Sequence, residues 1–173
     1  MKCPITLLGI AGFAVCFSQL LHAQSFTVRP GQWSAPSTWS NAIVPDHSSG
    51  EIIINHRVII PEDTILTIDD VTLNDTLIVA RNAVVTMTNA AASVPDLKIL
   101  AGGLKVFGRI ICSDSATFSG TSEANTFFFD GSVYEHRYFN TAGEPPTATW
   151  SGLSTLEITG YITGKSLTSV RWN

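Results

Sequence analysis

The chain has too few cysteines to be held together by disulfide bonds. Only 3 of its 173 residues are cysteine, and Cys3 and Cys16 lie in the apolar N-terminal segment. Cys112 is then alone in the rest of the chain, and one cysteine cannot form an internal disulfide. We therefore expect Cys112 to be a small buried residue and the fold to depend on burial of apolar side chains.

Positive charge is also scarce and dispersed. The sequence has 10 Lys and Arg against 14 Asp and Glu, which gives a formal net charge of −4 at pH 7. Binding to nucleic acid requires clustered Lys and Arg that neutralise phosphates, so we predict no nucleic-acid partner. The acidic balance also argues against docking on anionic membranes.

Motifs for cofactor and metal chemistry are missing as well. The sequence contains no phosphate-binding loop, no dinucleotide fingerprint and no nucleophile elbow. His47 and His56 are isolated, and no His or Cys lies at metal-ligand spacing from them. We therefore predict no cofactor and no metal site.

The first 23 residues have the pattern of a cleavable secretory signal. Lys2 precedes an uncharged, mainly apolar run over residues 5–21, and we place the cleavage between Ala23 and Gln24. A membrane span needs about 20 apolar residues; this run is slightly shorter and is interrupted by Gly, Ser and Gln. An uncleaved anchor is the alternative. The signal predicts a secreted or surface-displayed protein that leaves the membrane after cleavage.

Stretches of good helix formers are almost absent after the signal. The chain instead has many short runs rich in Val, Ile, Thr and Phe, separated by Gly, Asn, Asp and Pro. Such runs are typical of β-strands joined by turns. The predicted strands are residues 52–54, 58–60, 65–68, 77–79, 84–88, 97–100, 104–107, 110–112 and 127–129.

An internal repeat indicates how these strands are arranged. Residues 77–84 align without a gap with residues 97–104, at an offset of 20. The alignment places Asn82 opposite Gly102, and both residue types accept left-handed backbone at a turn. Short repeats that cannot bury their own apolar face become stable when they stack into a solenoid.

We therefore predict an all-β protein that folds as a right-handed parallel β-helix. Residues 24–50 form an N-terminal capping segment, and residues 51–173 form the coils. Because the end of the chain reads as a strand that nothing covers, we expect the coils to continue in a longer protein, or to associate end to end with another chain. The alternative fold is a β-sandwich or jelly roll whose hairpins happen to match.

Two tryptophans lie in the predicted capping segment. Trp33 and Trp39 are large enough to cover the open end of a first coil. A sugar-stacking platform is the alternative interpretation of this pair.

The same segment carries a family resemblance. The run Gly-Gln-Trp-Ser-Ala-Pro-Ser-Thr-Trp-Ser at residues 31–40, followed by Val44-Pro45 and the apolar run 52–54, resembles the opening of secreted right-handed β-helix proteins of Gram-negative bacteria. It is also similar to the start of G8 domains, although Asn82 occupies one of several positions where glycine is expected. The resemblance implies an exported protein with an adhesin-like or glycan-related role, and it implies no catalytic residue.

Candidate acid and base residues are few. They are Asp63, Asp69, Asp70, Asp75, Glu135 and His136. Adjacent residues of a strand point to opposite faces, so Asp69 and Asp70 cannot form a facing pair; we expect them, with Asp75, to be solvated turn residues. We predict no catalytic residue.

One run combines a carboxylate with aromatic rings. Tyr134, Glu135 and His136, with Tyr138 close behind, are our candidate contact for a glycan. An exposed strand and loop edge without a function is the alternative.

These observations favour a non-catalytic structural or interaction module that binds an extracellular glycan or a surface protein. The alternatives are part of a polysaccharide lyase or hydrolase whose catalytic residues lie largely outside this stretch, and a compact carbohydrate-binding sandwich. A line of carboxylates with Lys or Arg on one outer face would favour the enzyme. An exposed aromatic row without carboxylates would favour glycan binding.

Overall fold

The computed structural model describes residues 24–89, 95–113, 116–137 and 144–159. The predicted signal up to Ala23, the predicted glycan contact Tyr138 and the predicted final strand lie outside these residues. Gln24 is described and exposed, and its side-chain amide donates a hydrogen bond of 2.6 Å to Glu51. No helix within the described residues is long and apolar enough to cross a membrane.

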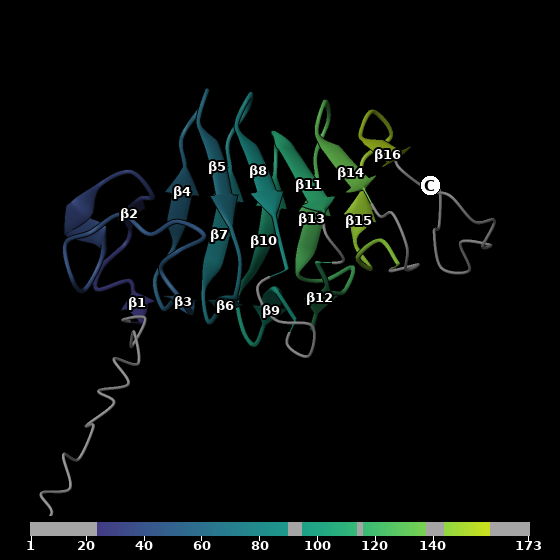
Figure 1. Ribbon diagram of the computed structural model, residues 1–173. Helices are drawn as coiled ribbons and strands as arrows, with labels where there is room; N and C mark the ends of the chain where they lie inside the picture. The colour runs from purple at the N-terminus through teal and green to yellow at the C-terminus, as the bar shows by residue number, and fades with distance from the viewer. Residues whose placement is uncertain (1–23, 90–94, 114–115, 138–143, 160–173) are drawn as a thin grey trace, which may run out of the picture.

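The described chain is built almost entirely of short β-strands (Figure 1). A single 3-10 helix, η1 (Pro36–Thr38), lies near the beginning of this part of the chain. The strands are β1 (Ser25–Phe26), β2 (Gly31–Gln32), β3 (Ile52–Ile54), β4 (Val58–Ile60), β5 (Ile65–Ile68), β6 (Val71–Leu73), β7 (Thr76–Val79), β8 (Val84–Met87), β9 (Leu97–Ile99), β10 (Gly103–Val106), β11 (Arg109–Ser113), β12 (Phe118–Ser119), β13 (Thr126–Phe128), β14 (Val133–Arg137), β15 (Thr149–Trp150) and β16 (Thr155–Thr159).

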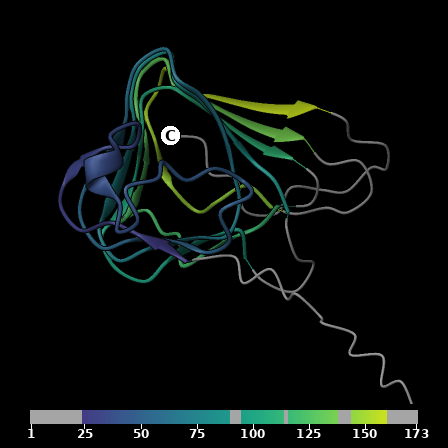
Figure 2. The same cartoon turned by 60° about the vertical axis from the view of Figure 1, so that its left-hand side comes forward.

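The strands form three parallel sheets. The first sheet has the order β1-β3-β6-β9-β12, the second β15-β13-β10-β7-β4-β2, and the third β16-β14-β11-β8-β5. The chain visits the three sheets in turn, as in β3-β4-β5 and then β6-β7-β8, so each coil lies on the one before it. In Figure 2 the successive coils overlie one another around a common interior. The predicted parallel β-helix is confirmed, and the sandwich or jelly roll is wrong, because hairpins would have given antiparallel ladders.

Alternation along each strand puts one set of side chains inside the coil. In β7, Leu77 and Val79 are fully buried, whereas Ile78 between them faces outward and is partly exposed, as the period of two requires. Each fully buried side chain of this kind stabilises the fold by roughly 1.5–3 kcal/mol. The inward ladder through Val79 in the second sheet includes Ile60, Val79, Val106 and Phe128.

The register of the coils differs from the predicted repeat. Leu77 lies beside Leu104, not Leu97, and Leu97 lies beside Val71 in another sheet. The aligned segments are therefore two strand–turn–strand corners, β7 to β8 and β9 to β10, that belong to different sides of the coil. Asn82 and Gly102 do both have left-handed backbone, with φ of 59° and 71°, as their residue types predict.

The segment that contains β1, β2 and η1 lies at one end of the stack (Figure 1). Trp33 and Trp39 are 1% and 2% exposed and pack edge to face, with ring centroids 4.9 Å apart. The indole N–H of Trp33 donates to the carbonyl of Pro45, and that of Trp39 to the carbonyl of Trp33. Because both rings are buried, neither offers a face on which a sugar could stack.

Candidate functional site

The predicted glycan contact lies on β14, and its two described rings are buried. Tyr134 and His136 are 0% and 1% exposed, in register with Ile110 and Cys112 of β11. The Tyr134 hydroxyl lies 3.2 Å from Nδ1 of His136. The expectation of an exposed edge is wrong, because alternate residues of β14 face the interior in the same way as those of β11. Neither ring can stack on a sugar.

Cys112 is buried, as predicted. Its thiol donates to the carbonyl oxygen of Ala116, with 2.9 Å between Sγ and the oxygen. It lies on an inward ladder of the third sheet, beside Met87 on one side and His136 on the other.

Glu135 faces outward but is covered by its neighbours. Arg109 Nη1 lies 2.7 Å from one of its carboxylate oxygens, and Arg137 Nη2 lies 2.7 Å from the other. The Thr159 hydroxyl donates to the second oxygen at 2.7 Å. Arg109 also reaches Glu157 at 2.8 Å, so this charged row connects β11, β14 and β16.

Electrostatics in this row argue against proton transfer by Glu135. Burial acts to raise the pKa of Glu135, but hydrogen bonds from Thr159 and Arg137 and the charges of Arg137 and Arg109 together hold that pKa below its usual value. A general acid needs a raised pKa. The row combines carboxylates with arginines, as the active site of an enzyme would. Three donors nevertheless keep the carboxylate of Glu135 ionised. Its evident effect is to hold three successive coils together.

The other acidic candidates lie at corners. Asp69 is only 6% exposed, so the expectation of a solvated turn residue is wrong for it. Burial is the main cause that raises the pKa of Asp69, with His47 opposing it and neighbouring acids adding to it. Burial likewise raises the pKa of Asp70, and Glu51 adds to the effect. Asp75 is a turn residue that accepts a hydrogen bond from the Thr76 amide at 2.6 Å.

Asp63, the remaining acidic candidate, is exposed in the corner between β4 and β5, where its φ is 58°. Within the described ranges no group of three His, Cys, Asp or Glu residues is placed to hold a metal ion.

A surface feature that the sequence did not reveal lies at the corner between the second and third sheets. Only residues 107–108 connect β10 to β11, whereas the neighbouring coils use the four residues 80–83 and 129–132. The strands on both sides stay in register, Val79 with Val106 and Val84 with Arg109. The two longer corners therefore project past the short one and leave a notch between them.

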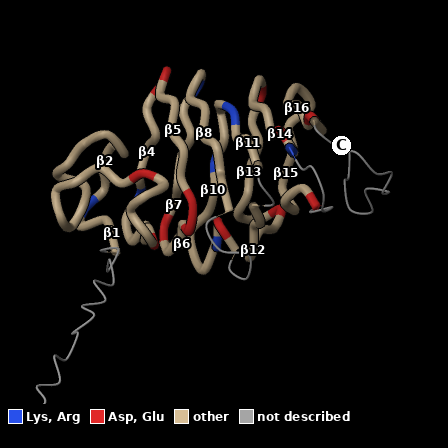
Figure 3. The backbone as a smooth tube through the Cα atoms, in the orientation of Figure 1, with Lys and Arg blue, Asp and Glu red and all other residues tan. Residues whose placement is uncertain are grey.

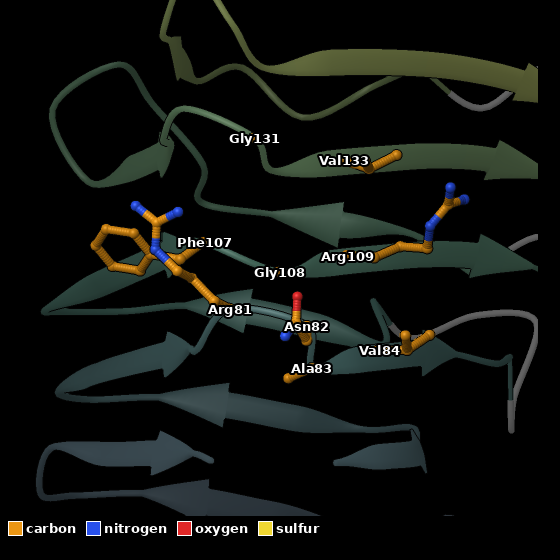
Figure 4. Close-up of a pocket in the computed structure, with 9 residues that line it drawn as sticks. All are labelled: Arg81, Asn82, Ala83, Val84, Phe107, Gly108, Arg109, Gly131 and Val133. Atoms are coloured by element: carbon orange, nitrogen blue, oxygen red, sulfur yellow. The ribbon is translucent and has the colours of Figure 1, made fainter. Parts of the chain in front are cut away.

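The notch has a volume of about 260 Å³. Figure 4 shows Arg81 and Phe107 at one end and Arg109 at the other, with Asn82 between them. Gly108 is buried in the floor of this corner: a Cβ there would come within 2.4 Å of the carbonyl oxygens of the corner before it. Only glycine lets the short corner pack so closely.

Charge changes sign along this edge of the stack. The corner before the notch contains Arg81, and the one before that contains Glu62 and Asp63; Asp130 lies in the corner that follows. Figure 3 shows this edge as red, blue, blue and red from β5 to β14. None of the residues that line the notch is acidic.

Aromatic side chains cluster beside the notch, at the end of β10 and on β13. Phe107 stacks on Phe129, with ring centroids 4.3 Å apart and planes at 4°. Phe127 lies 6.2 Å from Phe129 and is the register neighbour of Lys105. All three phenylalanines are partly exposed, and Lys105 is exposed.

No protein-family model, curated protein or solved structure matches the chain. The resemblance to secreted β-helix proteins and to G8 domains therefore stays a prediction.

Proposed function

We propose that this chain is a non-catalytic, glycan-binding β-helical module of a secreted or cell-surface protein. The binding surface is the outer face of the second sheet, from β7 to β13, together with the notch at its edge. The observation that carries the proposal is the cluster of partly exposed phenylalanines on this face: Phe107, Phe127 and Phe129.

The chemistry of this face suits a sugar. Aromatic rings supply large apolar contact area with defined geometry, and a contiguous apolar patch on a soluble protein commonly marks a binding surface. A ligand site also needs a few polar groups that orient the ligand, which Lys105, Arg81 and Asn82 supply here. The outward positions of the paired strands in the second sheet contain no carboxylate: Gln32, Ile59, Ile78, Lys105, Phe127 and Thr149.

The state of Glu135 favours binding over catalysis. Its ion pairs and its lowered pKa suit a structural carboxylate, and the aromatic face has no acid at its strand positions to protonate a glycosidic bond. The predicted signal implies export. An exported protein meets extracellular or envelope polysaccharides, which the proposed surface can bind.

The test is glycan binding by the purified protein and two variants. Phe127→Ala removes a ring from the proposed surface, and Phe26→Ala removes a partly exposed ring from the first sheet. We expect the protein to bind at least one oligosaccharide in a broad glycan panel. Phe127→Ala should bind it about threefold to tenfold more weakly, as the loss of one aromatic contact predicts, and Phe26→Ala should bind it unchanged. Equal weakening by both variants, or no binding by the parent protein, would contradict the proposal.

A further inference from the structure

We propose that the notch is a subsite for one anionic sugar residue, held through its carboxylate or sulfate group by Arg81. The inference rests on the proposed glycan-binding function and specifies which class of sugar it selects.

The notch exists because one corner is shorter than its neighbours. Residues 107–108 take the place that four residues occupy in the adjoining coils. Both walls are fixed by backbone hydrogen bonds, from the Arg109 amide to the Ala83 carbonyl at 2.8 Å and from the Val133 amide to the Gly108 carbonyl at 2.9 Å. The site is therefore already formed before a ligand arrives, which lowers the entropic cost of binding.

Of the two arginines in the notch, Arg81 is the one with donors available. The Arg109 guanidinium is already bound to Glu135 and Glu157. Arg81 is exposed and, within the described part of the chain, makes no hydrogen bond or ion pair; the same holds for the Asn82 side chain. A guanidinium binds carboxylate and other oxyanions through two parallel hydrogen bonds, and the Asn82 amide adds a donor beside it.

The size of the notch suits one sugar residue. Its volume of about 260 Å³ lies below the roughly 300–1,000 Å³ of sites for larger ligands. Phe107 lies at the same end as Arg81 (Figure 4) and belongs to the aromatic cluster that it forms with Phe129 and Phe127. A glycan can therefore place an anionic residue in the notch and extend neighbouring residues over the phenylalanines.

The surrounding acids restrict the choice further. Glu62 and Asp63 lie on the corner that precedes Arg81 in the stack, and Asp130 lies on the corner that follows the notch. These carboxylates repel negative charge on both sides of the cation. The arrangement favours a glycan in which anionic residues are separated by neutral ones over a ligand with continuous negative charge.

The experiment is calorimetric titration of the purified protein with matched oligosaccharides. The probes have alternating neutral sugars and uronic acids, the same chain with its carboxylates methyl-esterified, and a neutral chain with sulfate esters at alternating residues. Arg81→Ala removes the proposed donor, and Arg57→Ala removes an exposed arginine from the corner between the first and second sheets. Thermal unfolding of each variant verifies that it is folded.

We expect an anionic probe to bind more tightly than the esterified chain, and more weakly in high salt. Arg81→Ala should lose about tenfold to hundredfold in affinity for the anionic probe, as expected for a hydrogen bond between charged groups. Arg57→Ala should not change it. Preference for the uronic acid identifies carboxylate as the anion, and preference for the sulfated chain identifies sulfate; both support the inference.

Insertion of two residues between Phe107 and Gly108 gives a second test. It restores the corner to four residues and should fill the notch, removing the preference for the anionic probe. If the esterified and anionic chains bind equally and Arg81→Ala has no effect, the inference is wrong while the proposed function stands. If no oligosaccharide binds, both are wrong.

Discussion

Arg109 on β11 and Glu135 on β14 form an ion pair across two coils, with 2.7 Å between Nη1 and a carboxylate oxygen. The same nitrogen lies 2.8 Å from Glu157 on β16, so one side chain connects three strands of the third sheet. Because a solenoid is stabilised by the contacts between its stacked coils, such a connection bears directly on the stability of the last coils.

Replacement of Glu135 by Gln should destabilise the protein by about 1.5–3 kcal/mol at neutral pH, the range for a hydrogen bond to a charged group. The pKa of Glu135 is lowered in the folded protein, so its contribution is present above the unfolded pKa and is lost as the pH falls through the folded pKa. Urea unfolding at pH 7 and at pH 3 measures this. Glu123→Gln, at an exposed glutamate, is the control. A difference between the Glu135 variant and the parent that persists unchanged at pH 3 would contradict the ion-pair explanation.

Asp69 should have the opposite effect on stability. Burial raises the pKa of Asp69 in the folded protein, so the native state binds a proton more readily than the unfolded state. Stability therefore falls as the pH rises from the unfolded pKa to the folded pKa, and the full cost remains above both values. We expect Asp69→Asn to raise the melting temperature at pH 7, and the gain to shrink as the pH falls through the raised folded pKa of Asp69 towards the ordinary carboxyl pKa. Asp130→Asn, at an exposed corner, should show no such gain; a lower melting temperature for Asp69→Asn at pH 7 would refute the prediction.

Gly108 should not tolerate a side chain. A Cβ there would lie 2.4 Å from the carbonyl oxygens of Ala80 and Ala83, and backbone cannot move aside as a flexible side chain can. We expect Gly108→Ala to cost about 1–3 kcal/mol or more, as overpacking does. Gly152 lies in the equivalent corner of a later coil with nothing near its Cβ position. Gly152→Ala is therefore the control. Denaturant unfolding should show a clearly lower free energy of unfolding for Gly108→Ala than for Gly152→Ala, and equal costs would show that the short corner can relax.

The register in the second sheet gives a further prediction. Leu104 faces inward beside Leu77, whereas Lys105 faces outward beside Ile78. Leu104→Ala should cost about 2–5 kcal/mol, and Lys105→Ala should change the free energy of unfolding by less than about 0.5 kcal/mol. Chemical denaturation measures both, and the reverse order would mean that the register is wrong.

Much of the fold could be predicted because the apolar runs are short and sharply bounded. The predicted strands 52–54, 58–60 and 65–68 match β3, β4 and β5, since each is a run of Ile, Val, Leu and Thr closed by a turn residue. β6 was missed. It has only three residues, one of them Thr, and lies between Asp69-Asp70 and Asn74-Asp75, so turn signals dominate that stretch.

The register could not be predicted, because the corners differ in length. Paired residues in the second sheet are separated by 19 positions from Val58 to Leu77 but by 27 from Leu77 to Leu104. A search for one fixed period therefore matches corners that merely look alike.

Because the register was not predictable, the sequence also could not show which side chains of the predicted glycan contact are exposed. In β14 the alternation puts Tyr134 and His136 on one face and Glu135 on the other, but only the pairing with β11 decides which face is inside. The notch has no motif at all. It arises because two residues are missing relative to the neighbouring corners, and its sole trace in the sequence is the narrow gap between the predicted strands 104–107 and 110–112.

The most direct test of the proposed binding surface is nuclear magnetic resonance of isotopically labelled protein titrated with an oligosaccharide that it binds. We predict that amide shifts change at the corners 80–83, 107–108 and 129–132 and along β10 and β13, and that the first sheet is unaffected. Shift changes centred on the first sheet, or on the charged row of Arg109, Glu135 and Glu157 without the phenylalanines, would contradict the account.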